Sequence, residues 1–108
     1  KLALLESYTN PWYRYFMSYN PAKHFNNEDL PILALYGELD VQVTAKENLA
    51  GLTNILQGHR DATIKLLPSL NHMFQQAQTG SMDEYRQIEQ TFSPEALSLM
   101  SDWLNQRF

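Results

Sequence analysis

Two short apolar segments, separated by one amphipathic segment, constrain the fold of this chain more than any other feature. The segments LPILALYG (30–37) and ATIKLL (62–67) have the length and composition of strands buried on both faces of a sheet. Between them, residues 44–58 carry apolar side chains at helical spacing, and Thr44 and Glu47 form the pattern of a capping box. This order predicts a βαβ unit, with two parallel strands joined by a right-handed crossover.

Helices are expected on both sides of this unit. Residues 1–8 have the pattern of a helix tail, and a second helix is predicted between the two Asn-Pro pairs of residues 10–21. Ser93 and Pro94 mark the start of a last, amphipathic helix. Its apolar stripe contains Leu97, Met100, Trp103, Leu104 and Phe108. The predicted fold class is therefore α/β, a βαβ unit with flanking helices and a C-terminal amphipathic helix.

Two residues with catalytic potential follow the predicted strands. Asp40 comes after the first strand in the turn GELD, and His72 comes after the second strand in PSLNH. Parallel strands end at the same edge of a sheet, and ligands bind outside those carboxyl ends. We therefore expect Asp40 and His72 to lie side by side, although 32 residues separate them. A carboxylate beside an imidazole is the orienting pair of nucleophilic catalysis, in which the imidazole takes a proton from a hydroxyl.

These residues carry a resemblance to a known family. PILALYGELDVQV, then LPSLNHMFQQAQTGS, then the closing helix resemble the C-terminal part of an α/β-hydrolase. The likeness is closest to the esterase, acyl-transferase and dienelactone-hydrolase-like branch, and it extends over nearly the whole chain. It implies that Asp40, in a Gly-x-x-Asp turn, is the catalytic acid and that His72, preceded by Asn71, is the catalytic histidine. The acid precedes the histidine, as the chain order of that family requires.

The chain departs from the family pattern at the nucleophile. The family places its serine upstream of the acid in a G-x-S-x-G elbow, and no two of the four glycines here are four residues apart. No HGGG-type oxyanion segment is present, and the chain opens at Lys1 without a methionine or a signal-peptide pattern. We therefore expect residues 1–108 to be a C-terminal fragment of a hydrolase domain, whose main partner is the absent N-terminal part.

Simpler interpretations compete with each candidate residue. An aspartate shortly after a strand is often only a turn or helix-cap residue. Glu38 is a rival acid, but its place inside the turn predicts a solvated side chain. His24 and His59 lie in polar surroundings and are expected at the surface, and the histidines have no metal-ligand spacing. The aromatic residues of 12–19 could line an acyl pocket, but packing of their helix on the sheet is the favoured reading.

Composition excludes several other classes of function. A net charge of −4 gives no basic surface for nucleic acid, and no apolar run reaches the length of about 20 residues that spans a bilayer. The absence of cysteine removes disulfides, a thiolate nucleophile and cysteine zinc sites, but it does not fix the cellular compartment. The resemblance implies no cofactor.

The sequence thus predicts the acid- and histidine-bearing part of a serine hydrolase for small carboxylic esters or thioesters. The fragment alone would be inactive, because its nucleophile lies elsewhere. A non-catalytic assembly or binding module and the C-terminal part of a serine peptidase are the alternatives. An apolar first strand without an edge-blocking residue inside it also predicts a homodimer, if the 108-residue chain folds alone.

Overall fold

The computed structural model describes residues 8–25 and 30–108, so the helix tail expected at residues 1–8 falls almost entirely outside the described residues. The elements in chain order are α2 (Pro11–Ser18), α3 (Ala22–Phe25), β1 (Ile32–Gly37), α4 (Ala45–Ile55), β2 (Ala62–Leu67), the 3₁₀ helix η1 (Met82–Arg86) and α5 (Pro94–Asn105). No helix among the described residues is long and apolar enough to cross a membrane.

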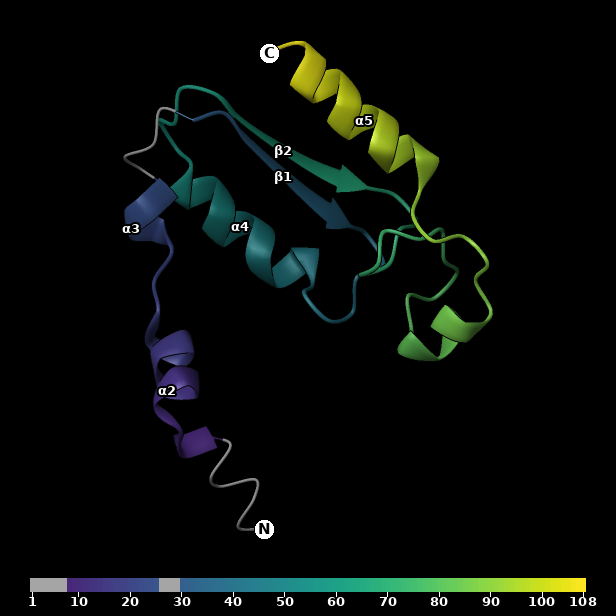
Figure 1. Ribbon diagram of the computed structural model, residues 1–108, viewed down its shortest axis with the longest axis horizontal. Coiled ribbons are helices and arrows are strands. Elements are labelled where there is room, and N and C mark those ends of the chain that lie inside the picture. Colours follow the sequence, from purple (N-terminus) through teal and green to yellow (C-terminus); the bar gives the residue numbers. More distant parts are fainter. Residues whose placement is uncertain (1–7, 26–29) are drawn as a thin grey trace.

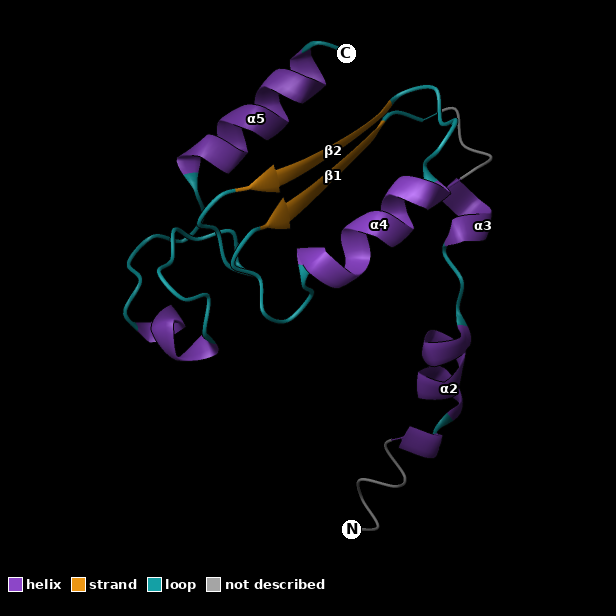
Figure 2. Ribbon diagram, turned by 180° about the vertical axis from the view of Figure 1, so that it is seen from behind, coloured by secondary structure: helices purple, strands orange, loops and turns teal. Residues whose placement is uncertain are grey.

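The predicted βαβ unit is confirmed. β1 and β2 form a parallel pair whose register runs from Ile32 opposite Ala62 to Gly37 opposite Leu67. The helices α4 and α5 lie on opposite sides of this pair (Figures 1 and 2). Successive residues of a strand point to opposite faces of the sheet. On the α5 side, Trp103 donates a hydrogen bond of 3.1 Å to the hydroxyl of Thr63 in β2. The described chain is therefore mixed α/β, with a two-stranded parallel sheet whose residues are mostly half-buried.

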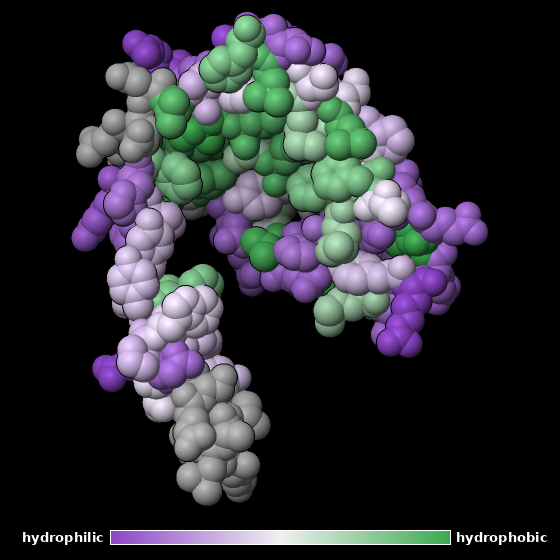
Figure 3. Space-filling model, in the orientation of Figure 1, coloured by the Kyte–Doolittle hydropathy of each residue, from purple (hydrophilic) through white to green (hydrophobic). Residues whose placement is uncertain are grey.

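The outer edge of β1 has no strand beside it within the described ranges. The N–H groups of Ile32 and Glu38 donate to the carbonyls of Asp61 and Leu67 on the β2 side, each at 2.9 Å. Alternate residues of a strand point their backbone groups in opposite directions, so Leu33 and Leu35 direct theirs to the open side. Apolar surface extends over this strand pair in the space-filling view (Figure 3).

The starts of the two long helices differ from each other. The Ser93 hydroxyl accepts a hydrogen bond from Ala96 N, with Pro94 at the first helical position, as predicted. The capping box predicted at α4 is wrong in part, because the Thr44 hydroxyl accepts no backbone N–H. It donates instead to the Glu47 carboxylate at 2.9 Å, and the side chain of Asn48 donates to the Thr44 carbonyl.

The hydrophobic core is small and lies at the carboxyl ends of the strands. Its fully packed members are Leu67, Leu70 and Ala96, with Leu35, Phe74, Phe92 and Leu99 packed against them. The stripe predicted for α5 is largely wrong, because Leu97 and Leu104 are half exposed and Phe108 is 87% exposed. The helix is rotated so that the small side chain of Ala96 approaches the core and Trp103 reaches β2.

The aromatic helix α2 does not pack on the sheet, so this expectation was wrong. None of its residues is buried, and α2 lies away from the strands (Figure 1). The rings stack on one another instead, as with Trp12 and Phe16, whose centroids are 5.4 Å apart. Neighbours at i and i+4 on a helix satisfy such contacts locally, without a sheet beneath them.

The amino ends of the strands are tied to the end of α5. The Arg107 guanidinium donates two hydrogen bonds to the Asp61 carboxylate, at 2.7 and 2.8 Å, and its centre lies 4.0 Å above the Trp103 ring. His59 lies beside this region. Its polar neighbours predicted a position at the surface, but the residue is half-buried. Its Nδ1 accepts a hydrogen bond from Asp61 N, which explains why the ring turns inward.

Candidate active site

Two loops meet beyond the carboxyl ends of β1 and β2. The Leu39 N–H donates to the Leu70 carbonyl at 2.9 Å, and the Asp40 N–H closes a turn on the Gly37 carbonyl at 3.2 Å. A Cβ atom at Gly37 would collide with the carbonyl oxygens of Leu70 and Asn71. Only glycine therefore permits the loop after β2 to lie this close to the end of β1.

Asp40 is held by its own loop and by the histidine. It is 9% exposed, and its Oδ1 accepts hydrogen bonds from Gln42 N at 2.8 Å and Val43 N at 2.9 Å. Its Oδ2 lies 2.9 Å from His72 Nδ1. Burial raises the pKa of the Asp40 carboxyl, but the hydrogen bonds from Val43, His72 and Gln42 together outweigh burial and lower that pKa below its usual value. Asp40 is therefore an anion at neutral pH.

The expected contact between Asp40 and His72 is confirmed by this distance. A carboxylate only accepts hydrogen bonds, so it favours the tautomer in which His72 Nδ1 carries the proton. Nε2 then carries a lone pair, and the side chain is 37% exposed. This arrangement suits a general base that takes a proton from a hydroxyl at Nε2.

Glu38, the rival acid, does not contact His72. Its side chain is exposed, as predicted, but it is not merely solvated. The carboxylate accepts a hydrogen bond of 3.0 Å from Ser69 N. Ser69 has a positive φ of 57°, so Glu38 stabilises a left-handed turn in the loop that leads to the histidine. Glu38 thus joins the two loops without taking part in the acid–histidine pair.

The two residues after His72, Met73 and Phe74, differ in burial. Met73 is half exposed. Phe74 does pack on the core, and its ring stacks on that of Phe92 with centroids 5.5 Å apart. The backbone of Phe74 has a φ of 55°, which costs a bulky residue about 1–3 kcal/mol. Strain of this size persists only where surrounding contacts enforce it.

Sequence reasoning missed the amides that hold this loop. Asn71 was noted only as part of a motif, yet it is completely buried, and Gln75 is 9% exposed. The Asn71 Nδ2 group donates to Gln75 Oε1 at 3.0 Å, and Gln75 Nε2 donates to the Gln90 carbonyl at 2.9 Å. The high density of polar amides in NHMFQQAQ was the available signal, but periodicity cannot show which of them are buried.

The segment 76–90 forms a further wall beside the Asp40 loop. Two of its residues, Glu84 and Tyr85, are half-buried. The Glu84 carboxylate accepts hydrogen bonds from Thr79 N at 2.9 Å and Gly80 N at 3.0 Å, and the Tyr85 hydroxyl accepts one of 2.7 Å from Gln42 Nε2. The pattern Ser81-x-x-Glu84 could have signalled this turn.

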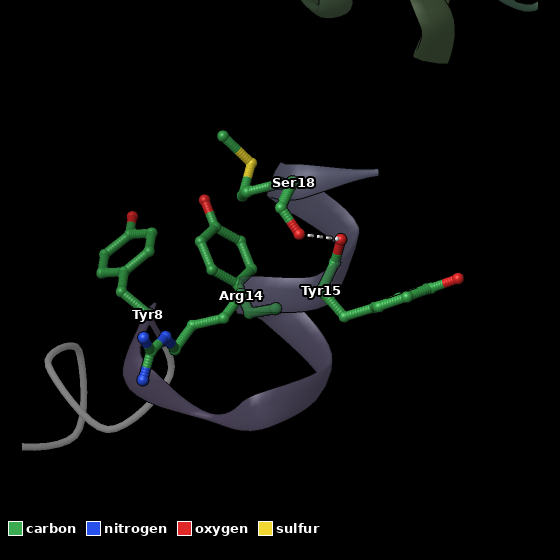
Figure 4. A pocket seen from close by; sticks show the side chains of 6 residues that line it. Tyr8, Arg14, Tyr15 and Ser18 are labelled. Atoms are coloured by element: carbon green, nitrogen blue, oxygen red, sulfur yellow. Dashed lines mark hydrogen bonds between the residues drawn. The ribbon is translucent and has the colours of Figure 1, made fainter. Parts of the chain in front are cut away.

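A surface hollow lies elsewhere, on α2. It is lined by Tyr8, Tyr13, Arg14, Tyr15, Met17 and Ser18 (Figure 4). The Ser18 hydroxyl donates to the Tyr15 carbonyl of its own helix at 3.0 Å. In Figure 1, α2 is far from the arrowheads of β1 and β2, so the structure does not place this hollow beside Asp40 and His72. It gives no support to an acyl pocket formed by these aromatic residues.

Within residues 8–25 and 30–108, no hydroxyl is hydrogen-bonded to His72, whose one side-chain partner is Asp40. The same residues contain no group of three histidine, aspartate or glutamate side chains placed to hold a metal ion. Comparisons with protein-family models, curated proteins and solved structures found no match. A functional assignment for this chain therefore depends on the geometry of its own residues.

Proposed function

We propose that this chain is the acid- and histidine-bearing part of a serine hydrolase with an α/β-hydrolase fold, which cleaves carboxylic esters or thioesters. The observation that supports this most is the 2.9 Å contact between buried Asp40 and His72 at the carboxyl ends of two parallel strands. That edge is where open α/β sheets bind their ligands. The resemblance of the two loops to those of α/β-hydrolases supports the same reaction.

In this mechanism His72 acts twice as a proton carrier. Its Nε2 takes the proton of a serine hydroxyl while the serine oxygen attacks the acyl carbon, and the proton then passes to the leaving alcohol or thiol. Water hydrolyses the acyl-serine by the same route. Asp40 fixes the tautomer of His72 and stabilises the imidazolium that forms. The serine and the oxyanion-hole donors would come from a part of the protein outside residues 1–108.

A purely structural role for the pair explains the site less completely. Capping of the Asp40 loop needs only Oδ1, which already accepts two backbone N–H groups. The second oxygen, Oδ2, is directed at a histidine that leaves Nε2 open to a further partner. The main alternative, a non-catalytic binding module, is favoured by the open edge of β1 and the apolar surface around it (Figure 3).

The test is ester turnover by the intact protein that carries this chain. His72→Ala should lower kcat for a p-nitrophenyl ester by about 10³-fold or more, because the triad acts as a unit. His24→Ala changes an exposed histidine and should leave turnover unchanged. Equal turnover by both variants would contradict the proposal, and cleavage of peptides but not of esters would favour the peptidase alternative.

A further inference from the structure

We propose that Asn71 is a positioning residue for His72 and that its buried side chain, together with Gln75, sets the place of the imidazole. The role as a positioning residue for catalysis rests on the proposed function. The geometric part, that Asn71 maintains the contact between His72 and Asp40, can be measured without any substrate.

The side chain of Asn71 uses both of its functional groups on the loop that carries His72. Its Oδ1 accepts hydrogen bonds from Met73 N at 2.9 Å and Gln75 N at 3.0 Å. Its Nδ2 donates to Gln75 Oε1 at 3.0 Å. The side chain is 0% exposed, so water cannot replace these bonds without a rearrangement. The side-chain amide of Asn71 thus holds the backbone on the far side of His72, at Met73 and Gln75.

The backbone of the same loop is closed by further hydrogen bonds at Asn71. Its N–H donates to the Gln75 carbonyl at 3.1 Å, and its carbonyl accepts the Phe74 N–H at 3.0 Å. This closure enforces the left-handed φ of 55° at Phe74. Removal of the Asn71 side chain would leave the N–H groups of Met73 and buried Gln75 without their acceptor, and the loop could then relax toward ordinary φ values.

Gln75 connects this loop to the rest of the domain. Its Nε2 donates to the Gln90 carbonyl, and the side chain of Gln90 in turn accepts the Gln76 N–H at 2.7 Å. The Phe74 carbonyl accepts the Ser93 N–H at 2.7 Å, directly at the start of α5. The histidine loop is therefore fixed to the segment before α5 through Gln75, to the start of α5 through the Phe74 carbonyl, and to the end of β1 beside Gly37.

His72 itself has few other means of staying in place. Among the residues that the structure describes, its one side-chain hydrogen bond is to Asp40, and the neighbouring Met73 is half exposed and lies outside the core cluster. The position of the imidazole therefore follows the backbone of the loop. A shift of about 1 Å in this loop would break the hydrogen bond to Asp40, and a misplacement of that size can cost about 10²-fold in rate.

The test compares Asn71→Ala with Asn54→Ala, which removes an exposed asparagine side chain near the end of α4. In the ¹⁵N-labelled intact protein, NMR of the histidine ring nitrogens should show one His72 tautomer, protonated at Nδ1, with a low-field proton signal. Asn71→Ala should lose that signal and mix the tautomers, whereas Asn54→Ala should keep both. A folded Asn71→Ala protein that retains the single tautomer and the low-field proton would overturn the inference.

Kinetics of the same variants test the catalytic consequence. Asn71→Ala should lower kcat for an ester by about 10–10²-fold with KM changed less than about twofold, because geometry and not binding is lost. If Asn71→Ala does not fold, Gln75→Met is the second variant, since it keeps the side chain of Asn71 but removes its partner. A folded Gln75→Met protein should show a weaker low-field signal, and an unchanged signal would overturn the inference. A wild type with the signal but without turnover would contradict the proposed function alone.

Discussion

The Nδ1 atom of His72 lies 2.9 Å from the Oδ2 atom of Asp40, although the two residues are 32 positions apart in the sequence. Two features of the fold produce this contact. The parallel register of β1 and β2 brings the carboxyl ends of both strands to one edge of the sheet. Gly37 then allows the loop after β2 to lie directly against the end of β1.

Gly37→Ala should disrupt this contact and destabilise the protein. The new Cβ would meet two backbone carbonyls that cannot rotate away, and overpacking of this kind costs about 1–3 kcal/mol. Gly51→Ala is the matched control, because it lies in α4 with open space around its Cβ, and it should stabilise by up to about 1 kcal/mol. Urea unfolding of both variants checks this, and equal effects of the two changes would refute the close approach.

The lowered pKa of Asp40 predicts a specific pH dependence of stability. A carboxyl whose pKa is lower in the folded state stabilises the fold above its unfolded pKa, about 3.9, and this contribution is lost as pH falls through the folded pKa. Asp40→Asn should therefore be less stable than wild type by about 2 kcal/mol at pH 7, and the difference should shrink below about pH 4. Urea unfolding across this range gives the values.

Asp83→Asn serves as the control for that series, since Asp83 is an exposed aspartate of η1. Its stability should follow that of wild type at every pH. A constant difference between wild type and Asp40→Asn down to pH 2 would show that the hydrogen bonds to the Asp40 carboxylate do not depend on its charge.

The open edge of β1 predicts self-association of the 108-residue chain. The backbone groups of Leu33 and Leu35 point away from β2, and the surrounding surface is apolar (Figure 3). The most direct arrangement is a C₂ dimer that pairs the two edges and buries more than about 1,000 Å². Leu33→Lys should shift sedimentation equilibrium toward monomer, whereas Leu104→Lys, on the exposed side of α5, should not. A monomer at all concentrations for the unmodified chain would contradict the prediction.

The parts of the fold that follow from periodicity could be predicted from the sequence. Apolar patterns predicted both strands and the crossover helix, and a cap predicted the start of α5 at Ser93. Such patterns and caps depend on residues that are close in sequence. The pairing of Asp40 with His72 followed from topology alone, because parallel strands end together.

The remaining parts depend on contacts that a linear pattern does not contain. The rotation of α5 is set by the fit of Ala96 against Leu67 and Leu70, not by its most apolar stripe. The aromatic side chains of α2 are exposed because no other element among the described residues packs against them. The burial of Asn71 and the left-handed backbone of Phe74 arise from hydrogen bonds that form only after both loops are in place.

The central claim is that His72 serves a serine located outside residues 1–108, and covalent labelling tests it most directly. A fluorophosphonate probe should label the intact protein once, at a serine outside this chain, and His72→Ala should abolish the labelling. The 108-residue chain alone should neither react with the probe nor hydrolyse p-nitrophenyl esters faster than free imidazole. Stoichiometric labelling of one of its own seven serines, or labelling of the intact protein that is unaffected by His72→Ala, would contradict the account.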